Sequence, residues 1–203
     1  MKLEHRFEVT ASPDQAMALM LDGNRVIPCM PGAELDTQVD ERTWKAKMTV
    51  ALGPVKMHFV ADVHVDQIDE EAKRARLVFT GRDTRGMGSA QGASAAHFVG
   101  IDGGRTRVEL DTDVQFSGKA AQMGRPNVVN DVSQTLVGKF AHCLQIQLTG
   151  SAEEAMHARE DSSKPLSGIT VMGAAAKGAV GRLFHRDKDE DDTDNDEGKG
   201  DAT

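Results

Sequence analysis

The sequence has few cysteines: Cys29 and Cys143 are the two among 203 residues, and they stand far apart. Neither belongs to a C-x-x-C pair. The spacing therefore argues against a disulfide scaffold and against a zinc site. We expect both to be buried thiols.

Long apolar runs are also missing. The sequence has no stretch of about 18 uncharged apolar residues, the length that is needed to span a bilayer. The opening MKLEHRFEV also lacks the basic-then-apolar layout of a signal peptide. A cytoplasmic protein is therefore expected.

The body of the chain has little net charge. The formal charge is −8, but residues 187 to 203 hold nine acidic and two basic side chains and carry −7 of it, which leaves −1 for residues 1 to 186. A near-neutral body without a basic stripe gives no electrostatic footprint for nucleic acid. Nucleic acid is therefore excluded as a partner.

Catalytic and metal-binding motifs are missing as well. There is no Gly-x-Ser-x-Gly elbow, phosphate loop or Cys-His arrangement, and the seven histidines lack metal-ligand spacing. The glycines of residues 86–92 resemble a dinucleotide loop, but no helix follows them and the region alternates like antiparallel strands. The sequence predicts no metal, no catalytic residue and a binding protein rather than an enzyme.

Strand patterns dominate what is present. From residue 42 to 117, apolar and polar side chains alternate, which is typical of strands with one buried face. Residues 3–9 read as another strand, followed by a helix that Ser12 caps and Pro13 begins, and by a short helical stretch over 22–26. Apolar residues at three- and four-residue steps predict a long helix over 119–149, with Pro126 separating its first turns. The fold class is α+β, with a curved antiparallel sheet around one long helix.

One predicted strand has an inward row of almost no volume: Gly88, Ala90, Gly92, Ser94 and Ala96. Protein interiors leave few voids larger than a water molecule, so either a close helix or a ligand must fill the space beside this row. The glycines could also simply bend the sheet and admit the helix. Both interpretations can hold together.

The chain after residue 150 is divided into three parts. Residues 151–164 are polar without an apolar period and are expected to be a flexible linker. Residues 165–186 have one apolar stripe with basic residues toward the end, typical of a segment that folds against an anionic membrane or a partner, although it could also dock on its own domain. Its proposed contact residues are Leu166, Ile169, Met172, Lys177, Val180, Arg182, Leu183, Phe184 and Arg186. Residues 187–203 are expected to be a disordered acidic tail.

Residues 1–150 resemble a known family. The resemblance rests on Cys29-Met30-Pro31-Gly32-Ala33-Glu34-Leu35, on Gly53-Pro54-Val55, on Gly88-Ser89-Ala90 with Gly92, and on Gly118, Ala121, Gln122 and Gly124. These motifs and the order of elements resemble the carbon monoxide dehydrogenase CoxG family, within the START-like (SRPBCC) helix-grip superfamily of polyketide cyclases and lipid carriers. The resemblance implies a seven-stranded helix-grip domain over residues 1–150. It also implies an accessory protein that recruits a molybdenum carbon monoxide dehydrogenase, or a related hydroxylase, to the cytoplasmic membrane.

These observations together predict a carrier. A dehydrogenase that feeds a respiratory chain needs a quinone, which is nearly insoluble in water, so we expect an internal cavity that binds menaquinone or ubiquinone as its hydrophobic small molecule. The protein would be cytoplasmic and peripheral on the inner face of the membrane. A ligand-free anchoring scaffold is the alternative, and a cyclase-type enzyme is a third. The expected lining residues are Trp44, Met48, Met57, Phe59, Phe79, Ala90, Ser94, Phe98, Val114, Phe116, Met123, Val132, Leu136 and Phe140.

Overall fold

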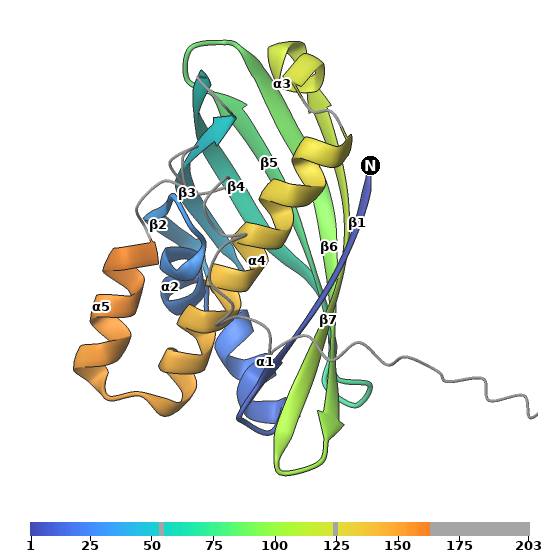
Figure 1. The fold of residues 1–203 in the computed structure, drawn as a ribbon, viewed down its shortest axis with the longest axis vertical. Helices are drawn as coiled ribbons and strands as arrows, with labels where there is room; N and C mark the ends of the chain where they lie inside the picture. The colour runs from blue at the N-terminus through green and yellow to red at the C-terminus, as the bar shows by residue number, and fades with distance from the viewer. Residues whose placement is uncertain (53–54, 124–125, 163–203) are drawn as a thin grey trace, which may run out of the picture.

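A computed structural model describes residues 1–52, 55–123 and 126–162. In these residues seven strands form one antiparallel sheet in the order β1-β7-β6-β5-β4-β3-β2. The strands are β1 (Lys2–Val9), β2 (Ala33–Asp40), β3 (Thr43–Leu52), β4 (Val55–Asp69), β5 (Arg74–Asp83), β6 (Gly88–Ile101) and β7 (Arg105–Ser117). The sheet curves around α4, as the sequence pattern predicts (Figure 1).

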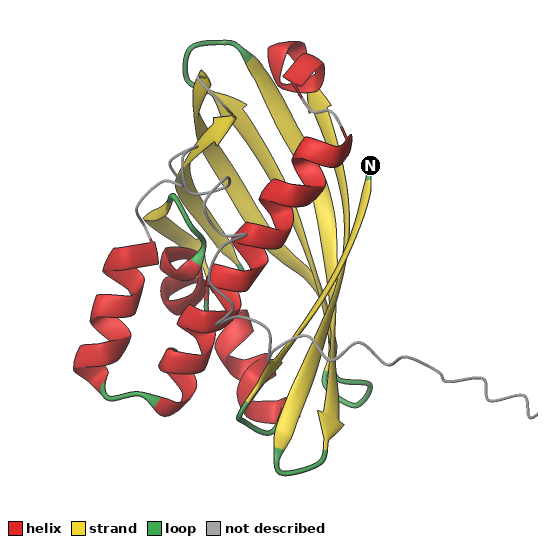
Figure 2. Cartoon of the chain, viewed as in Figure 1, coloured by secondary structure: helices red, strands yellow, loops and turns green. Residues whose placement is uncertain are grey.

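The helices lie on one side of this sheet, and none of the described helices covers its other face (Figure 2). They are α1 (Pro13–Leu21), α2 (Gly23–Val26) with the 3-10 turn η1 (Ile27–Cys29), α3 (Gly118–Met123), α4 (Pro126–Thr149) and α5 (Ala152–Ser162). Pro126 begins α4 and separates it from α3, as expected.

Local sequence signals determine where α1 begins. The Ser12 hydroxyl accepts a hydrogen bond from the Gln15 backbone N–H, and the Gln15 side chain accepts one from the Ser12 N–H. This reciprocal capping box satisfies two donors at the helix end, and Pro13 occupies a first-turn position where no donor is required.

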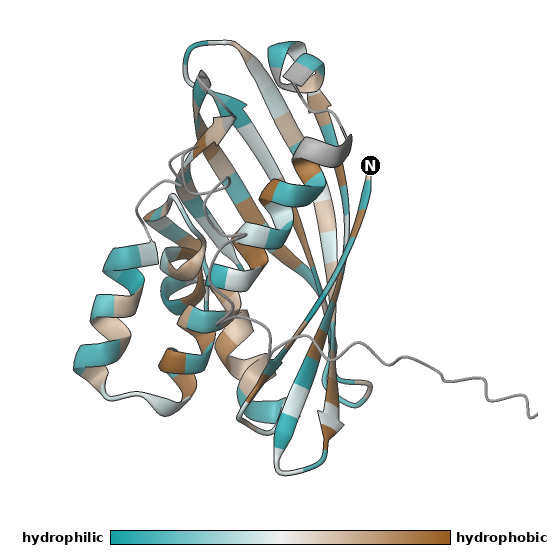
Figure 3. Cartoon of the chain, viewed as in Figure 1, coloured by the Kyte–Doolittle hydropathy of each residue, from teal (hydrophilic) through white to brown (hydrophobic). Residues whose placement is uncertain are grey.

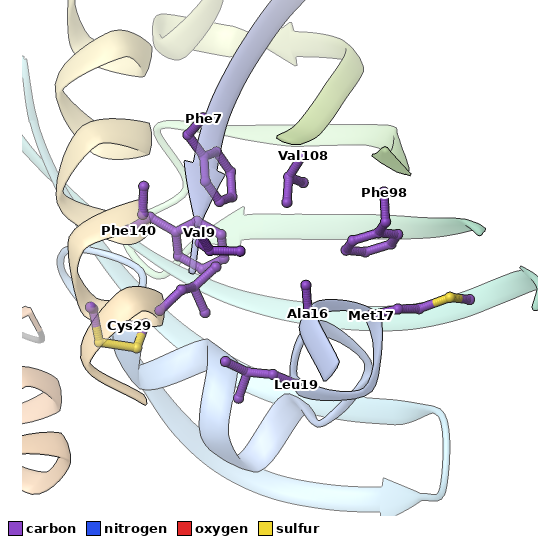
Figure 4. Packing of buried hydrophobic residues seen from close by; sticks show 12 residues of the cluster. Phe7, Val9, Ala16, Met17, Leu19, Cys29, Phe98, Val108 and Phe140 are labelled. Carbon is purple, nitrogen blue, oxygen red and sulfur yellow. A yellow bond between two sulfur atoms is a disulfide. The ribbon is translucent and has the colours of Figure 1, made fainter. Parts of the chain in front are cut away.

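The largest apolar core closes one end of the curved sheet. Phe7 of β1, Phe98 of β6 and Phe140 of α4 belong to it together with residues of α1, and the Phe7 and Phe140 rings meet edge to face with centroids 6.2 Å apart (Figure 4). Edge-to-face pairs of this kind add about 0.5 to 1.5 kcal/mol beyond area burial. This core fixes the second half of α4 against β1 and α1.

The two cysteines correct the sequence-based expectation. Both are buried as predicted, but they are not free thiols: Cys29 and Cys143 form a disulfide with a Cα–Cα distance of 5.5 Å. The bond joins η1 to α4 across 114 residues of sequence. Sequence spacing cannot reveal such a pair, because only the fold brings the two residues together.

The expected linker over residues 151–164 is wrong for most of its length, because residues 152–162 form α5. The Ser151 hydroxyl accepts from the Glu154 N–H, and the Glu154 carboxylate accepts from the Ser151 N–H, which is a second capping box. Gln147 of α4 donates from its side-chain amide to the Ala155 carbonyl at 2.8 Å. The helix is mainly hydrophilic (Figure 3). It is therefore stabilised by polar contacts and a helix cap rather than by an apolar stripe.

Candidate ligand-binding site

The inner face of the sheet is the candidate site. Along each strand the side chains that point toward the helices are mostly apolar, which follows from the two-residue period of the sequence pattern. Beyond the Phe7–Phe98–Phe140 core many of these side chains, including Leu77, Phe79 and Phe116, are only half-buried. In a filled interior such large apolar side chains on central strands would be buried.

The predicted lining residues fall into two groups. Half-buried are Met48, Phe79, Ala90, Ser94, Phe116, Val132 and Leu136. Buried are Trp44, Met57, Phe59, Phe98, Val114 and Phe140. The side chain of Met123 lies outside the described residues.

Five of the buried residues belong to hydrophobic clusters. Met57 and Phe59 form one cluster, against which Met48, Ala90 and Phe116 pack. Phe98 and Phe140 belong to the large core at the closed end of the sheet. Trp44 lies in a separate cluster with Ile27, Ala33 and Val65. The half-buried group is therefore the better candidate for ligand contact.

The row of small residues on β6 has a third explanation that the sequence did not suggest. Gly92 pairs with Phe79 of β5, and a Cβ added at Gly92 would lie 2.9 Å from Phe79 Cζ. The same Cβ would lie 2.2 Å from the Asp113 carbonyl oxygen on β7. The Phe79 ring therefore covers part of the space beside this row, and Gly92 also permits a close backbone approach.

Sequence reasoning missed one polar contact on this face. His5 of β1 points inward, and its Nε2 lies 3.0 Å from the Ser133 hydroxyl of α4. Burial lowers the pKa of His5. The alternation Leu3, His5, Phe7, Val9 already placed His5 in an inward row, so the signal was present in the sequence.

A small pocket lies around the start of β2, the middle of β3 and the first half of β4, and two of the predicted lining residues, Met48 and Phe59, border it. Its volume is about 190 Å³, and Lys47, Met48, His58 and Phe59 are among its lining residues. Ligand sites for drug-sized molecules usually have about 300 to 1,000 Å³. This pocket is therefore too small for a quinone with an isoprenoid tail.

Comparison with known proteins identifies the family. The family model for CoxG, a subunit of carbon monoxide dehydrogenase, matches residues 6–149. The chain belongs to the CoxG family. The match extends from β1 to the end of α4, so the family predicted from the sequence motifs is confirmed.

This CoxG chain has the helix-grip α+β fold, and solved structures resemble it. A conserved protein from Geobacillus kaustophilus is 18% identical with a TM-score of 0.64, over 73% of this chain and 95% of that one. Ara h 8.0201 is 14% identical with a TM-score of 0.49, over 74% and 99% of the two chains. A truncated norcoclaurine synthase from Thalictrum flavum is 15% identical with a TM-score of 0.48, over 74% and 94%. The sequence has no match among curated proteins.

The predicted membrane contacts come after α5, the last described helix. All of the contact residues predicted between 165 and 186, and the acidic tail from 187, lie outside the described residues. Within the described part of the chain, no helix is long and apolar enough to cross a membrane.

Proposed function

We propose that this CoxG-family chain is a non-enzymatic accessory protein of a molybdenum carbon monoxide dehydrogenase, and that it carries a respiratory quinone, menaquinone or ubiquinone. One observation carries the proposal: large apolar side chains on the inner face of the sheet remain half-buried although they face α4. Burying a quinone tail on such a face contributes about 0.8 kcal/mol per methylene-sized group. The family supports the enzyme partner, since its description names carbon monoxide dehydrogenase.

The same protein recruits the enzyme to the cytoplasmic side of the membrane. The sequence of residues 165–186 supports this step, because an apolar stripe with Lys177, Arg182 and Arg186 matches an anionic lipid surface. Each basic side chain near such a surface adds about 1 kcal/mol. A quinone carrier at the membrane would then supply an electron acceptor to the dehydrogenase.

The carrier role is tested by extraction and uptake. Organic extraction of the purified chain, followed by mass spectrometry, is expected to release a quinone, and added menaquinone is expected to quench the fluorescence of Trp44. If no quinone or lipid co-purifies and none is taken up, the carrier role is wrong and the ligand-free scaffold replaces it.

A matched pair of variants locates the binding face. Ala90 points toward the helices and Ala95, in the same strand, lies exposed on the outer face. Ala90→Phe fills space on the inner face and is expected to abolish quinone uptake, whereas Ala95→Phe leaves it unchanged. Equal uptake by both variants would place the quinone elsewhere.

Membrane recruitment has its own test. Deletion of residues 165–203 is expected to abolish binding to vesicles of anionic phospholipid, and deletion of residues 187–203 alone is expected to preserve it. Binding should also weaken as salt is raised, because ions screen the basic side chains. Undiminished vesicle binding after the longer deletion would refute the anchor.

A further inference from the structure

The inner face carries a small group of polar side chains among its apolar ones. Most inward positions are apolar, but His5 of β1, Thr112 of β7 and Ser94 of β6 lie on three neighbouring strands. Thr112 and Ser94 are cross-strand partners, and His5 is two residues from Leu3, which pairs with Thr112. The three residues therefore lie on the same face of the sheet: Ser94 lies directly beside Thr112, and His5, which pairs with Leu110, lies diagonally across from Thr112.

Two other inward polar residues differ from this group because the backbone uses them. The Thr106 hydroxyl donates to the Ala11 carbonyl at 2.7 Å, and it is fully buried. The Asp83 carboxylate accepts from three backbone N–H groups and holds the turn after β5. By contrast, the side chains of His5, Ser94 and Thr112 form hydrogen bonds with other side chains and with no backbone group, within the described part of the chain.

These contacts leave hydrogen-bonding capacity free. The Ser94 and Thr112 hydroxyl oxygens lie 2.8 Å apart, so one O–H donates to the other and the second O–H still lacks an acceptor among the described residues. Ser133 donates its own hydroxyl to the Asn130 carbonyl, so it accepts from His5 Nε2–H. The Nδ1 atom of a neutral His5 then remains an acceptor. All three residues are half-buried, so solvent or a ligand can reach them.

We propose that Ser94, Thr112 and His5 form a polar subsite that binds the oxygen atoms of the ligand's ring. This inference rests on the proposed carrier function and adds an orientation to it. A carbonyl oxygen of the ring accepts from the free Ser94 or Thr112 hydroxyl. In the reduced form, a ring hydroxyl can donate to His5 Nδ1.

The arrangement of the inner face determines where the tail lies. On one side of the subsite the Phe7–Phe98–Phe140 core closes the sheet. On the other side the inward residues of β6 continue as Gly92, Ala90 and Gly88, beside Phe79 and Phe116. At about 3.3 Å per residue, Ser94 lies about 20 Å from Gly88 along the strand. The ring therefore binds at the closed end, and several isoprene units extend over the apolar half toward α3.

The experiment measures the binding of two probes to the full chain. Menaquinone-4 binding is followed by quenching of Trp44 fluorescence, and squalene binding is followed by displacement of menaquinone-4, which restores that fluorescence. Menaquinone-4 has ring oxygens, and squalene is an isoprenoid hydrocarbon without oxygen. Ser94→Ala with Thr112→Val removes both hydroxyl groups at nearly constant volume. Loss of the hydrogen bonds is expected to weaken menaquinone-4 binding by about tenfold while squalene binding is unchanged.

Two matched variants separate chemistry from folding. Thr112→Ser keeps the hydroxyl and is expected to bind menaquinone-4 as the unchanged chain does. Thr80→Val makes the same substitution on the exposed outer face of β5 and is expected to change neither probe. His5→Gln is expected to weaken the reduced, hydroxyl-bearing form of menaquinone-4 more than the oxidised form.

Each alternative result has a separate meaning. If the unchanged chain binds menaquinone-4 and the double variant binds it equally well, the polar subsite is refuted and the carrier function stands. If the double variant loses both probes to the same extent, the residues support the sheet and do not recognise oxygen, and the subsite is again refuted. If the unchanged chain binds neither probe, the carrier function itself fails and the subsite fails with it.

Discussion

The indole ring of Trp44 lies directly against Gly23 at the start of α2: a Cβ added at Gly23 would come within 2.4 Å of the ring atoms Cδ2 and Cε2. Trp44 is 3% exposed. The glycine therefore allows α2 to approach β3, and the one tryptophan of the chain reports on this contact.

Gly23→Ala is expected to destabilise the protein by about 1 to 3 kcal/mol, because the added methyl group must displace a packed ring. Urea unfolding followed by Trp44 fluorescence measures the change. The control is Gly138→Ala in α4, where an added Cβ would meet nothing within 4 Å. There the substitution is expected to stabilise α4 by about 0.5 to 1 kcal/mol. Equal effects at the two positions would contradict the packing.

Reduction of the Cys29–Cys143 disulfide is expected to lower the free energy of unfolding by about 3 to 5 kcal/mol, because the bond constrains a long loop of the unfolded chain. The measurement is urea unfolding with and without dithiothreitol. The Cys29→Ala, Cys143→Ala double variant should not respond to the reductant. Two reactive thiols in the chain unfolded without reductant would show that the bond does not form.

His5 makes stability depend on pH in a defined direction. Its pKa is lowered by burial from the ordinary value of 6.5. The unfolded chain therefore binds a proton at pH values where the folded chain does not, and the contribution of His5 is present above about pH 6.5 and is lost as the pH falls below it. Unfolding midpoints measured between pH 8 and 5.5 should decline less in His5→Gln than in the unchanged chain. The exposed His142→Gln is the control, and parallel curves for all three proteins would contradict this role.

The capping box of α5 provides a fourth prediction. Ser151→Ala removes the hydroxyl that accepts from the Glu154 N–H, and loss of such a cap costs about 1 kcal/mol. Amide exchange in α5 should accelerate about fivefold while exchange in the strands stays the same. Ser162→Ala at the other end of α5 is the control, since it keeps the cap. Unchanged exchange in α5 would show that tertiary contacts alone hold this helix.

Some of these features could be read from sequence because they depend on neighbours in the chain. The alternation of Trp44, Ala46 and Met48 placed β3 with the correct face inward, and Ser12-Pro13 placed the start of α1. The same local logic was available at Ser151 and Glu154, but the polar composition of that segment favoured a linker. A capping box without an apolar stripe is a weak signal, because most helices are held by an apolar face.

Other features depend on partners that lie far away in sequence. The Cys29–Cys143 bond and the Gly23–Trp44 contact each join two elements that only the folded chain brings together, and the Ser94–Thr112 pair requires the register of β6 on β7. Half of the candidate ligand residues could be distinguished from core residues only by how far the folded chain buries them. Alternation shows that a side chain points inward, but it does not show whether an aromatic ring, a helix or open space lies opposite.

By itself, the sequence determined the strand over residues 3–9, the strands between 42 and 117 with their inward faces, the break at Pro126 and the family, because these follow from the period of the backbone and from short motifs. The alternation did not predict β2, an edge strand whose residues are mostly exposed. Only the tertiary structure decided that the cysteines pair, that residues 152–162 form a helix against α4, and that the polar pairs Ser94–Thr112 and His5–Ser133 form on the inner face. The physical reason is that hydrogen bonds, disulfides and packing contacts act over a few ångströms in space, whatever the separation of the residues along the chain.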